Sequence, residues 1–256
     1  MIVAYDPYVG TWGKYTREQI VKMVAEAGYE GINVPLRPDF VDPSKKSELD
    51  ATAELLTKHR LAVPSIGIGK HTITTPGKQR EIQDWFVLAL EAAKRLGAHI
   101  IAFWPSLPKG VTLEDARAAL TENLRAMLPA AEKAGCALAL EFEKGCTLDN
   151  YRDGIAYVNA TDKRIQLTAD TYHVFNDKAD QYTAAVALRG YLADVHISGS
   201  HRGEPGSEGD QVDYRGFLRG LREIGYTGPL TLQYHLKDPS SMKRACEFTK
   251  RLRDTK

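Results

Sequence analysis

Four short segments of the chain end in polar side chains that could bind a metal ion or carry a proton. These segments are Cys136–Glu143, Ile165–Asp170, Ala193–Ile197 and Leu230–His235. Side chains of an extended strand alternate between two faces, so the apolar residues of each segment define one face and the polar residues the other. This alternation predicts that the following residues share the polar face: Glu141, Glu143, Asp170, His196, Gln233 and His235.

The chemistry of this set is that of a divalent metal site. Buried carboxylates such as Glu141 and Asp170 repel each other unless a cation or a proton lies between them. Carboxylate, imidazole and amide oxygen together suit Mn²⁺, Co²⁺, Mg²⁺ or Zn²⁺. We therefore expect Glu141, Asp170, His196 and Gln233 to bind one divalent metal ion, with Mn²⁺ as the first choice. Any one of them alone is equally explained as a solvated residue at an open rim.

Short apolar runs alternate with amphipathic stretches along the whole chain, a pattern typical of parallel strands joined by helices. Strands are expected at Ile2–Tyr5, Gly31–Pro35, Leu61–Ile66, His99–Trp104, Cys136–Phe142, Ile165–Asp170, Leu192–Ile197 and Leu230–Tyr234. Helices are expected at Arg17–Ala27, Ser47–His59, Gln79–Leu96, Leu113–Ala134, Asn150–Asn159, Ala179–Leu188, Tyr214–Ile224 and Ser240–Leu252.

Eight such units predict a single-domain α/β fold, a (β/α)₈ TIM barrel over residues 1–256, whose ligand site lies where the strands end. A doubly wound sheet is the alternative, but the first predicted strand is followed by Asp6-Pro-Tyr-Val-Gly-Thr-Trp-Gly, which does not fit GxGxxG.

Composition narrows the expected partners. Lys and Arg (34) nearly balance Asp and Glu (33), so charge alone gives no support for binding nucleic acid or a membrane surface. Three cysteines without paired spacing fit a reducing compartment, and no signal peptide is recognisable at the N-terminus. We expect a cytoplasmic protein that binds a small sugar or keto-sugar, and we leave open whether it forms homo-oligomers.

Several motifs resemble one known family, the xylose isomerase-like barrels of the sugar phosphate isomerases and epimerases. They are Ala139-Leu-Glu141, Asp170-Thr-Tyr-His173, His196-Ile-Ser-Gly-Ser-His-Arg202 and Gly225-Tyr-Thr-Gly-Pro-Leu-Thr-Leu-Gln233. The resemblance implies that Glu141, Asp170 and His196 bind the metal. It also implies that His173 and Arg202 contact oxygens of the substrate.

The chain departs from this family at the eighth strand. The epimerases carry there a glutamate that is both a metal ligand and a catalytic base, whereas this chain has Gln233. An amide oxygen can coordinate a cation but does not take up a proton at neutral pH. Glu143 and His235 are the expected replacement bases beside Glu141, although either could instead orient a ligand. Trp12 and Trp104 are expected to give the sugar an apolar floor, or else to pack the loops.

These residues favour a metal-dependent isomerase or epimerase, which abstracts a proton next to the carbonyl of a keto-sugar through a metal-stabilised enediolate. The alternative is a lyase or dehydratase that eliminates a β-substituent from a keto-sugar, an inosose or a 3-keto-glycoside. A nuclease resembling endonuclease IV is disfavoured because further zinc ligands of that family are missing from the sequence. A barrel that binds a sugar without transforming it is the remaining possibility.

Overall fold

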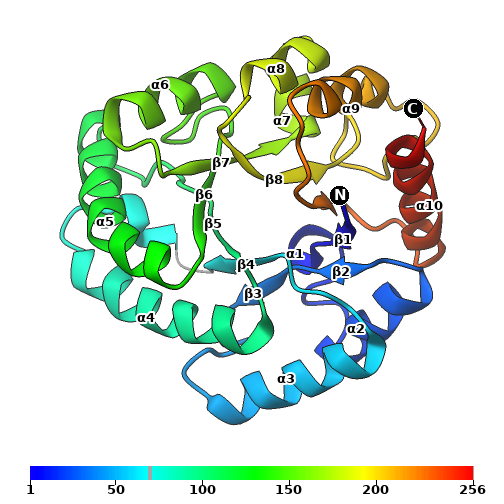
Figure 1. Ribbon diagram of the computed structural model, residues 1–256, viewed down its shortest axis with the longest axis horizontal. Coiled ribbons are helices and arrows are strands. Elements are labelled where there is room, and N and C mark those ends of the chain that lie inside the picture. The colour runs from blue at the N-terminus through cyan, green and yellow to red at the C-terminus, as the bar shows by residue number, and fades with distance from the viewer. Residues whose placement is uncertain (69–70, 256) are drawn as a thin grey trace.

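A closed ring of parallel strands, surrounded by helices, forms the centre of the computed structural model, which describes residues 1–68 and 71–255 (Figure 1). The strands are β1 (Val3–Tyr5), β2 (Gly31–Ile32), β3 (Val34–Leu36), β4 (Ser65–Ile68), β5 (Ile100–Phe103), β6 (Ala137–Glu141), β7 (Gln166–Asp170), β8 (Leu192–Ile197) and β9 (Leu230–Leu232). Hydrogen-bonded neighbours follow the order β2-β1-β9-β8-β7-β6-β5-β4-β3. Because β2 and β3 are two parts of one strand interrupted at Asn33, the two ends of this order meet. The predicted TIM barrel is confirmed.

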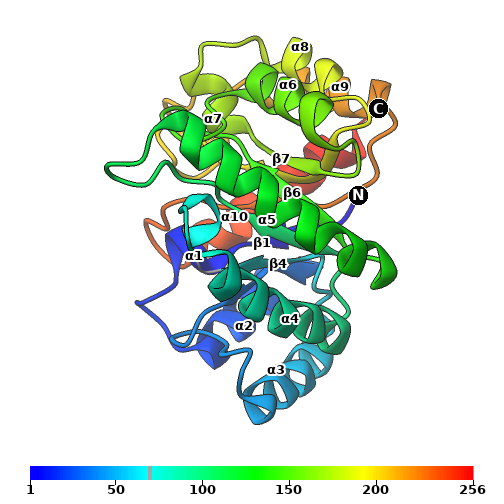
Figure 2. The ribbon, with the colours of Figure 1, turned by 90° about the vertical axis from the view of Figure 1, so that its left-hand side faces the viewer.

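The helices that cover the ring lie close to the predicted positions. They are α2 (Arg17–Glu26), α3 (Lys46–His59), α4 (Gln79–Leu96), α5 (Leu113–Lys133), α6 (Tyr151–Thr161), α8 (Gln181–Ala187), α9 (Tyr214–Glu223) and α10 (Ser240–Asp254). Figure 2 shows α3, α4 and α5 side by side along one flank. Short helices α1 (Pro7–Gly10), α7 (Thr171–Asn176) and the 3₁₀ turn η1 (His71–Thr74) were not predicted, since each is too brief to show helical periodicity.

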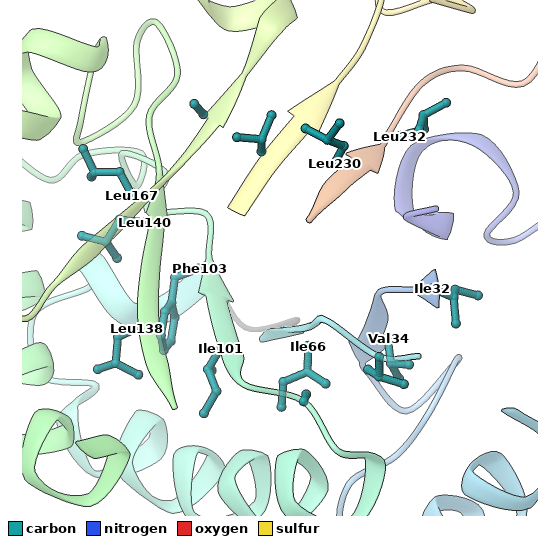
Figure 3. Packing of buried hydrophobic residues seen from close by; sticks show 14 of the residues in the cluster. Ile32, Val34, Ile66, Ile101, Phe103, Leu138, Leu140, Leu167, Leu230 and Leu232 are labelled. Atoms are coloured by element: carbon teal, nitrogen blue, oxygen red, sulfur yellow. The ribbon is translucent and has the colours of Figure 1, made fainter. Parts of the chain in front are cut away.

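The apolar faces of the strands pack between the ring and the helices, as the alternation predicts. Leu138, Leu140 and Phe142 are at most 1 % exposed. Figure 3 shows Leu138, Ile101 and Ile66 pointing from three neighbouring strands toward the helix layer. Burial of each such side chain contributes about 1.5–3 kcal/mol. The opposite faces of the same strands are thereby turned toward the inside of the ring.

Two predicted strands differ from the observed ones by more than one residue at an end. The run Leu61–Ile66 was expected to be the third strand, but β4 begins only at Ser65. Leu61 and Val63 are buried where the chain leaves α3, and Pro64, which has no N–H for a ladder, separates them from the strand. The last strand was expected to reach Tyr234, whereas β9 ends at Leu232. No helix in residues 1–68 and 71–255 is long and apolar enough to cross a membrane.

Candidate active site at the mouth of the barrel

Four adjacent strands bring the predicted metal ligands to one end of the ring. Glu141 and Asp170 are the last residues of β6 and β7, His196 lies on β8 opposite Asp170, and Gln233 directly follows β9. The exposed fractions of these four residues are 9, 0, 4 and 5 %. Since polar groups are costly to bury without partners, this cluster needs favourable contacts within itself or with a ligand.

Glu141 lies at the centre of the cluster. Its Oε1 atom is 3.2 Å from Nδ1 of His196 and 3.4 Å from Nε2 of His173. Nε2 of His173 is in turn 4.0 Å from Oδ2 of Asp170. Single ligand atoms of Glu141, Asp170 and His173 all lie within 4.8 Å of one another. Two carboxylates and an imidazole that close together form a buried group that could hold a metal ion.

Asp170 and Gln233 are joined by the guanidinium group of Arg202. Nη1 of Arg202 donates a hydrogen bond of 2.7 Å to Oδ2 of Asp170, and Nη2 donates to Oε1 of Gln233. The same Nη1 is 3.1 Å from Nε2 of His173. The other carboxylate oxygen of Asp170 accepts the backbone N–H of Tyr172 at the start of α7, which fixes the orientation of the side chain. Arg202 therefore lies among the predicted metal ligands.

The buried charges shift one another's protonation. Burial alone would raise the pKa of Glu141, but His196 and His173 hold it well below the usual value of a glutamate. Burial disfavours a charged imidazole, yet Glu141 raises the pKa of His196 well above its ordinary value. The pKa of His173 is also raised, because Glu141 and Asp170 outweigh the effect of burial. Glu141 is thereby kept ionised, which is the form in which a carboxylate binds a metal ion.

His196 has a further carboxylate on its far side. Oδ2 of Asp194 lies 3.8 Å from Nε2 of His196, and neither atom has a hydrogen-bond partner in the described part of the chain. A carboxylate behind a histidine commonly fixes which ring nitrogen carries the proton, and leaves the other nitrogen as a ligand. In this arrangement Nδ1 of His196, the atom nearest Glu141, is the one directed at the cluster.

A cavity of about 180 Å³ opens beside the cluster. It is smaller than the roughly 300–1,000 Å³ of pockets for drug-sized ligands, and so it suits a small molecule. Its lining residues come from every part of the ring: Asp6, Tyr8, Pro35, Arg37, Gly67, Ala102, Phe103, Trp104, Glu141, Glu143, Thr168, His196, Arg202 and Gln233. Trp104 and Glu143 meet in this wall, where Nε1 of the indole donates a hydrogen bond of 2.6 Å to Oε2 of the carboxylate.

Four predicted site residues do not line this cavity: Asp170 and His173 belong to the cluster beside it, whereas Trp12 and His235 do not. Trp12 stacks on Tyr8, with ring centroids 5.2 Å apart, and Cζ of Arg37 lies 4.0 Å from the centroid of the Trp12 ring. Trp12 therefore supports two lining residues without lining the cavity itself. His235 is exposed and borders a separate surface hollow. The alternation that placed it inward ends with β9 at Leu232, so its side chain is not brought to Glu141.

Sequence reasoning missed Asp6, Tyr8 and Arg37. Asp6 directly follows β1, and the alternation through Ala4 would have assigned it to the inside of the ring, had the predicted strand not stopped at Tyr5. Tyr8 lies on α1, a helix with no periodic signal. Arg37 directly follows β3, and nothing in its neighbouring sequence distinguishes it from a solvated charge.

Known proteins resemble this chain in sequence and in fold. A ketose 3-epimerase from Arthrobacter globiformis is 25 % identical over 228 residues, which are 83 % of this chain and 75 % of that protein. The structure of D-psicose 3-epimerase with D-tagatose from Clostridium cellulolyticum H10 superposes with a TM-score of 0.86 at 14 % identity, and covers 100 % of both chains.

A 3-keto-D-glucoside 4-epimerase from E. coli gives a TM-score of 0.82 at 18 % identity, again over 100 % of both chains. At these identities the two solved structures show a common fold, and the ketose 3-epimerase is a distant relative. Residues 21–252 match the family described as xylose isomerase-like TIM barrel, and this chain belongs to that family.

Proposed function

We propose that this protein is a divalent-metal-dependent isomerase or epimerase, which moves a proton at the carbon next to the carbonyl of a keto-sugar. The observation that carries the proposal is the position of Glu141, a buried carboxylate in contact with two histidines and at the edge of a cavity of sugar size. The distant ketose 3-epimerase relative supports the same class of substrate.

The proposed metal ligands are Glu141, Asp170, His196 and Gln233. Their donor set of two carboxylates, an imidazole and an amide oxygen suits Mn²⁺ first, with Co²⁺, Mg²⁺ or Zn²⁺ as other candidates. A bound divalent cation would act as a Lewis acid that polarises the substrate carbonyl and so acidifies the neighbouring C–H.

The chain's own residues perform the proton transfer and hold the sugar. Glu141 is the proposed base, because its low pKa keeps it ionised and it faces the cavity. Arg202 and His173 donate to substrate oxygens from the Asp170 side of the cluster. Glu143, whose Oε1 lies 3.9 Å from Nδ1 of His173, and Trp104 form the neighbouring wall, where the indole gives an apolar surface and its N–H fixes the carboxylate. His235 has no part in this proposal because it lies outside the cavity.

A second reaction outcome is favoured by one residue. Gln233 stands where an epimerase of this family would carry its second carboxylate, and a site with a single base can eliminate a β-substituent after the first proton is removed. The substrate would then be a 3-keto-glycoside, an inosose or another keto-sugar. The structural likeness to a 3-keto-D-glucoside 4-epimerase is compatible with such a substrate.

The test is an incubation of the Mn²⁺-loaded protein with ketohexoses and a 3-keto-glucoside in D₂O, followed by NMR and mass spectrometry. We expect deuterium at the carbon next to the carbonyl, together with a new epimer. Free aglycone or an enone without a labelled sugar would assign the chain to the lyases instead. Absence of both, with each of the four metals, would refute proton abstraction. Glu141→Gln is the matched inactive control.

A further inference from the structure

Asp6 is a buried carboxylate in the cavity wall to which neither the metal site nor the proposed base gives a role. It is 9 % exposed and lines the same cavity as Glu141, His196 and Gln233. The inference drawn from it deepens the proposed proton transfer and rests on that function.

The strand register places Asp6 beside Gln233. Tyr5 of β1 pairs with Leu232 of β9, and the backbone N–H of Asp6 donates a hydrogen bond of 2.9 Å to the carbonyl oxygen of Leu232. Asp6 and Gln233 are therefore the next residues on two neighbouring strands, at the same level of the barrel. The end of β9 carries an amide, Gln233, and the neighbouring strand β1 carries the carboxylate of Asp6 at the same level.

The ring places Asp6 opposite Glu141. From β1 to β6 the order passes through β9, β8 and β7 on one side, and through β2/β3, β4 and β5 on the other. β1 and β6 are thus diametrically opposed in an eight-stranded barrel, as Figure 1 shows. A substrate in the cavity between them presents one face to Glu141 and the other to Asp6. Inversion at a carbon requires a proton to leave from one face and to arrive on the other.

The surroundings of Asp6 suit a group that carries a proton. Oδ1 accepts the backbone N–H of Tyr8 at 2.8 Å, and Oδ2 accepts Nδ2 of Asn33 at 3.5 Å. In the described part of the chain no Lys, Arg or His lies within ion-pair distance of Asp6. Burial raises the pKa of Asp6, a shift that His196 opposes and Glu141 reinforces from across the cavity. His196, Glu141, Tyr5 and Tyr8 are the titratable groups that interact with Asp6.

We propose that Asp6 is a second catalytic acid–base residue, which exchanges a proton with the substrate carbon on the face opposite Glu141. Glu141 takes the proton from this carbon, and the electron pair of the broken C–H bond moves to the carbonyl oxygen. Asp6 then gives its carboxyl proton to the same carbon, and the electron pair returns to form the new C–H bond. After this step Glu141 is protonated and Asp6 is ionised. Exchange of protons with solvent returns both carboxyl groups to their starting protonation states.

The experiment compares Asp6→Asn with the wild-type protein, both loaded with Mn²⁺, on a ketohexose deuterated at the carbon that is inverted. Two rates are measured in H₂O: loss of deuterium from the starting sugar, and formation of the epimer. In the variant we expect epimer formation to fall about 10²–10⁴-fold, the usual contribution of a general acid or base. Loss of deuterium from the starting sugar continues, because Glu141 still removes the label and returns a solvent proton to the same face.

Two further readouts separate this role from a structural one. Mn²⁺ affinity, measured by calorimetry, is expected to stay within about threefold of wild type, since Asp6 is not among the proposed ligands. Asp6→Ser keeps an oxygen that can accept the N–H of Tyr8. In this variant too, epimer formation is expected to fall while loss of deuterium from the starting sugar continues.

The inference is overturned if epimer formation persists in both variants, or if both rates fall by the same factor while the variants bind Mn²⁺ normally. Failure of the proposed function itself looks different. In that case the wild-type protein would neither lose deuterium nor form an epimer.

Discussion

The wall of the cavity has two unlike halves. Strands β6 to β9 contribute Glu141, Thr168, His196 and Gln233, which we call the polar arc. Strands β3 to β5 contribute Pro35, Gly67, Ala102 and Phe103, the apolar arc. The same strand architecture underlies both arcs, so the difference lies only in which side chains the strand ends carry. The ionisable side chains Glu141 and His196 belong to the polar arc, whereas the apolar arc carries none.

Asp6 lies where the polar arc ends. Its strand, β1, is the neighbour of β9 on one side and of β2 on the other. The carboxylates of Glu141 and Asp170 are close to histidines or Arg202, whereas Asp6 has only neutral hydrogen-bond partners. This contrast distinguishes Glu141, whose pKa the two histidines lower, from Asp6, whose pKa burial raises.

The largest effect is expected when a proposed metal ligand is removed from the strands that carry the polar arc. Asp170→Asn is expected to weaken Mn²⁺ binding by more than about 100-fold, because even residues that only orient ligands are worth 10–100-fold in affinity. Calorimetric titration measures the effect. Thr168→Val changes a residue of the same strand that lines the cavity but is not a proposed ligand, and this control is expected to bind Mn²⁺ normally. Equal affinities in the two variants would remove Asp170 from the site.

A change in the apolar arc should act on the substrate and leave the metal alone. A Cβ atom built on Gly67 has nothing within 4 Å, and the residue lines the cavity, so Gly67→Val fills space that the sugar would use. We expect KM for the sugar to rise about tenfold or more, with Mn²⁺ affinity unchanged. The control is Ile66→Val, a neighbour that faces the helices (Figure 3). Weaker Mn²⁺ binding by Gly67→Val would contradict this, because it would show that a change in the apolar arc also affects the metal site.

The smallest expected effect is that of Asp6→Asn on the pH dependence of the protein's stability. Burial raises the pKa of Asp6 above its unfolded value, so the folded protein favours the protonated form. The contribution to stability is fully present below the unfolded pKa and is lost as the pH rises through the folded pKa. The side chain of Asp6→Asn cannot ionise, so the variant does not lose this stability. Its Tm relative to wild type should therefore increase between pH 4 and pH 7, by about 2–4 °C for each kcal/mol of unfolding free energy that the wild type loses. Thermal melts of metal-free protein would contradict this if the difference were independent of pH.

Regular strands explain why the polar arc was predictable. Alternation of Leu138, Leu140 and Phe142 with Ala139 and Glu141 fixes the inward face wherever a strand continues, and the same pattern holds on β7 and β8. Beyond the end of a strand the alternation is no longer a safe guide: it holds for Gln233, one residue after β9, but not for His235, three residues after it. His235 was assigned inward although β9 ends at Leu232, and Asp6 was overlooked although β1 leads directly to it.

The contacts made by short segments could not be predicted from the sequence. His173 reaches Glu141 because α7 turns back over the end of β7, and Trp12 is held behind Tyr8 by α1. Neither helix is long enough to show a hydrophobic period, so the direction of these side chains depends on tertiary packing. The hydrogen bond between Trp104 and Glu143 joins loops after two different strands, which no local pattern predicts.

A crystal grown with Mn²⁺, with data collected at the manganese absorption edge, tests the central claim most directly. The account predicts one anomalous peak per chain at the ends of β6 to β9, bonded to Glu141, Asp170, His196 and Gln233, with Arg202 turned away from Asp170. A peak elsewhere, or no peak at saturating Mn²⁺, would contradict it.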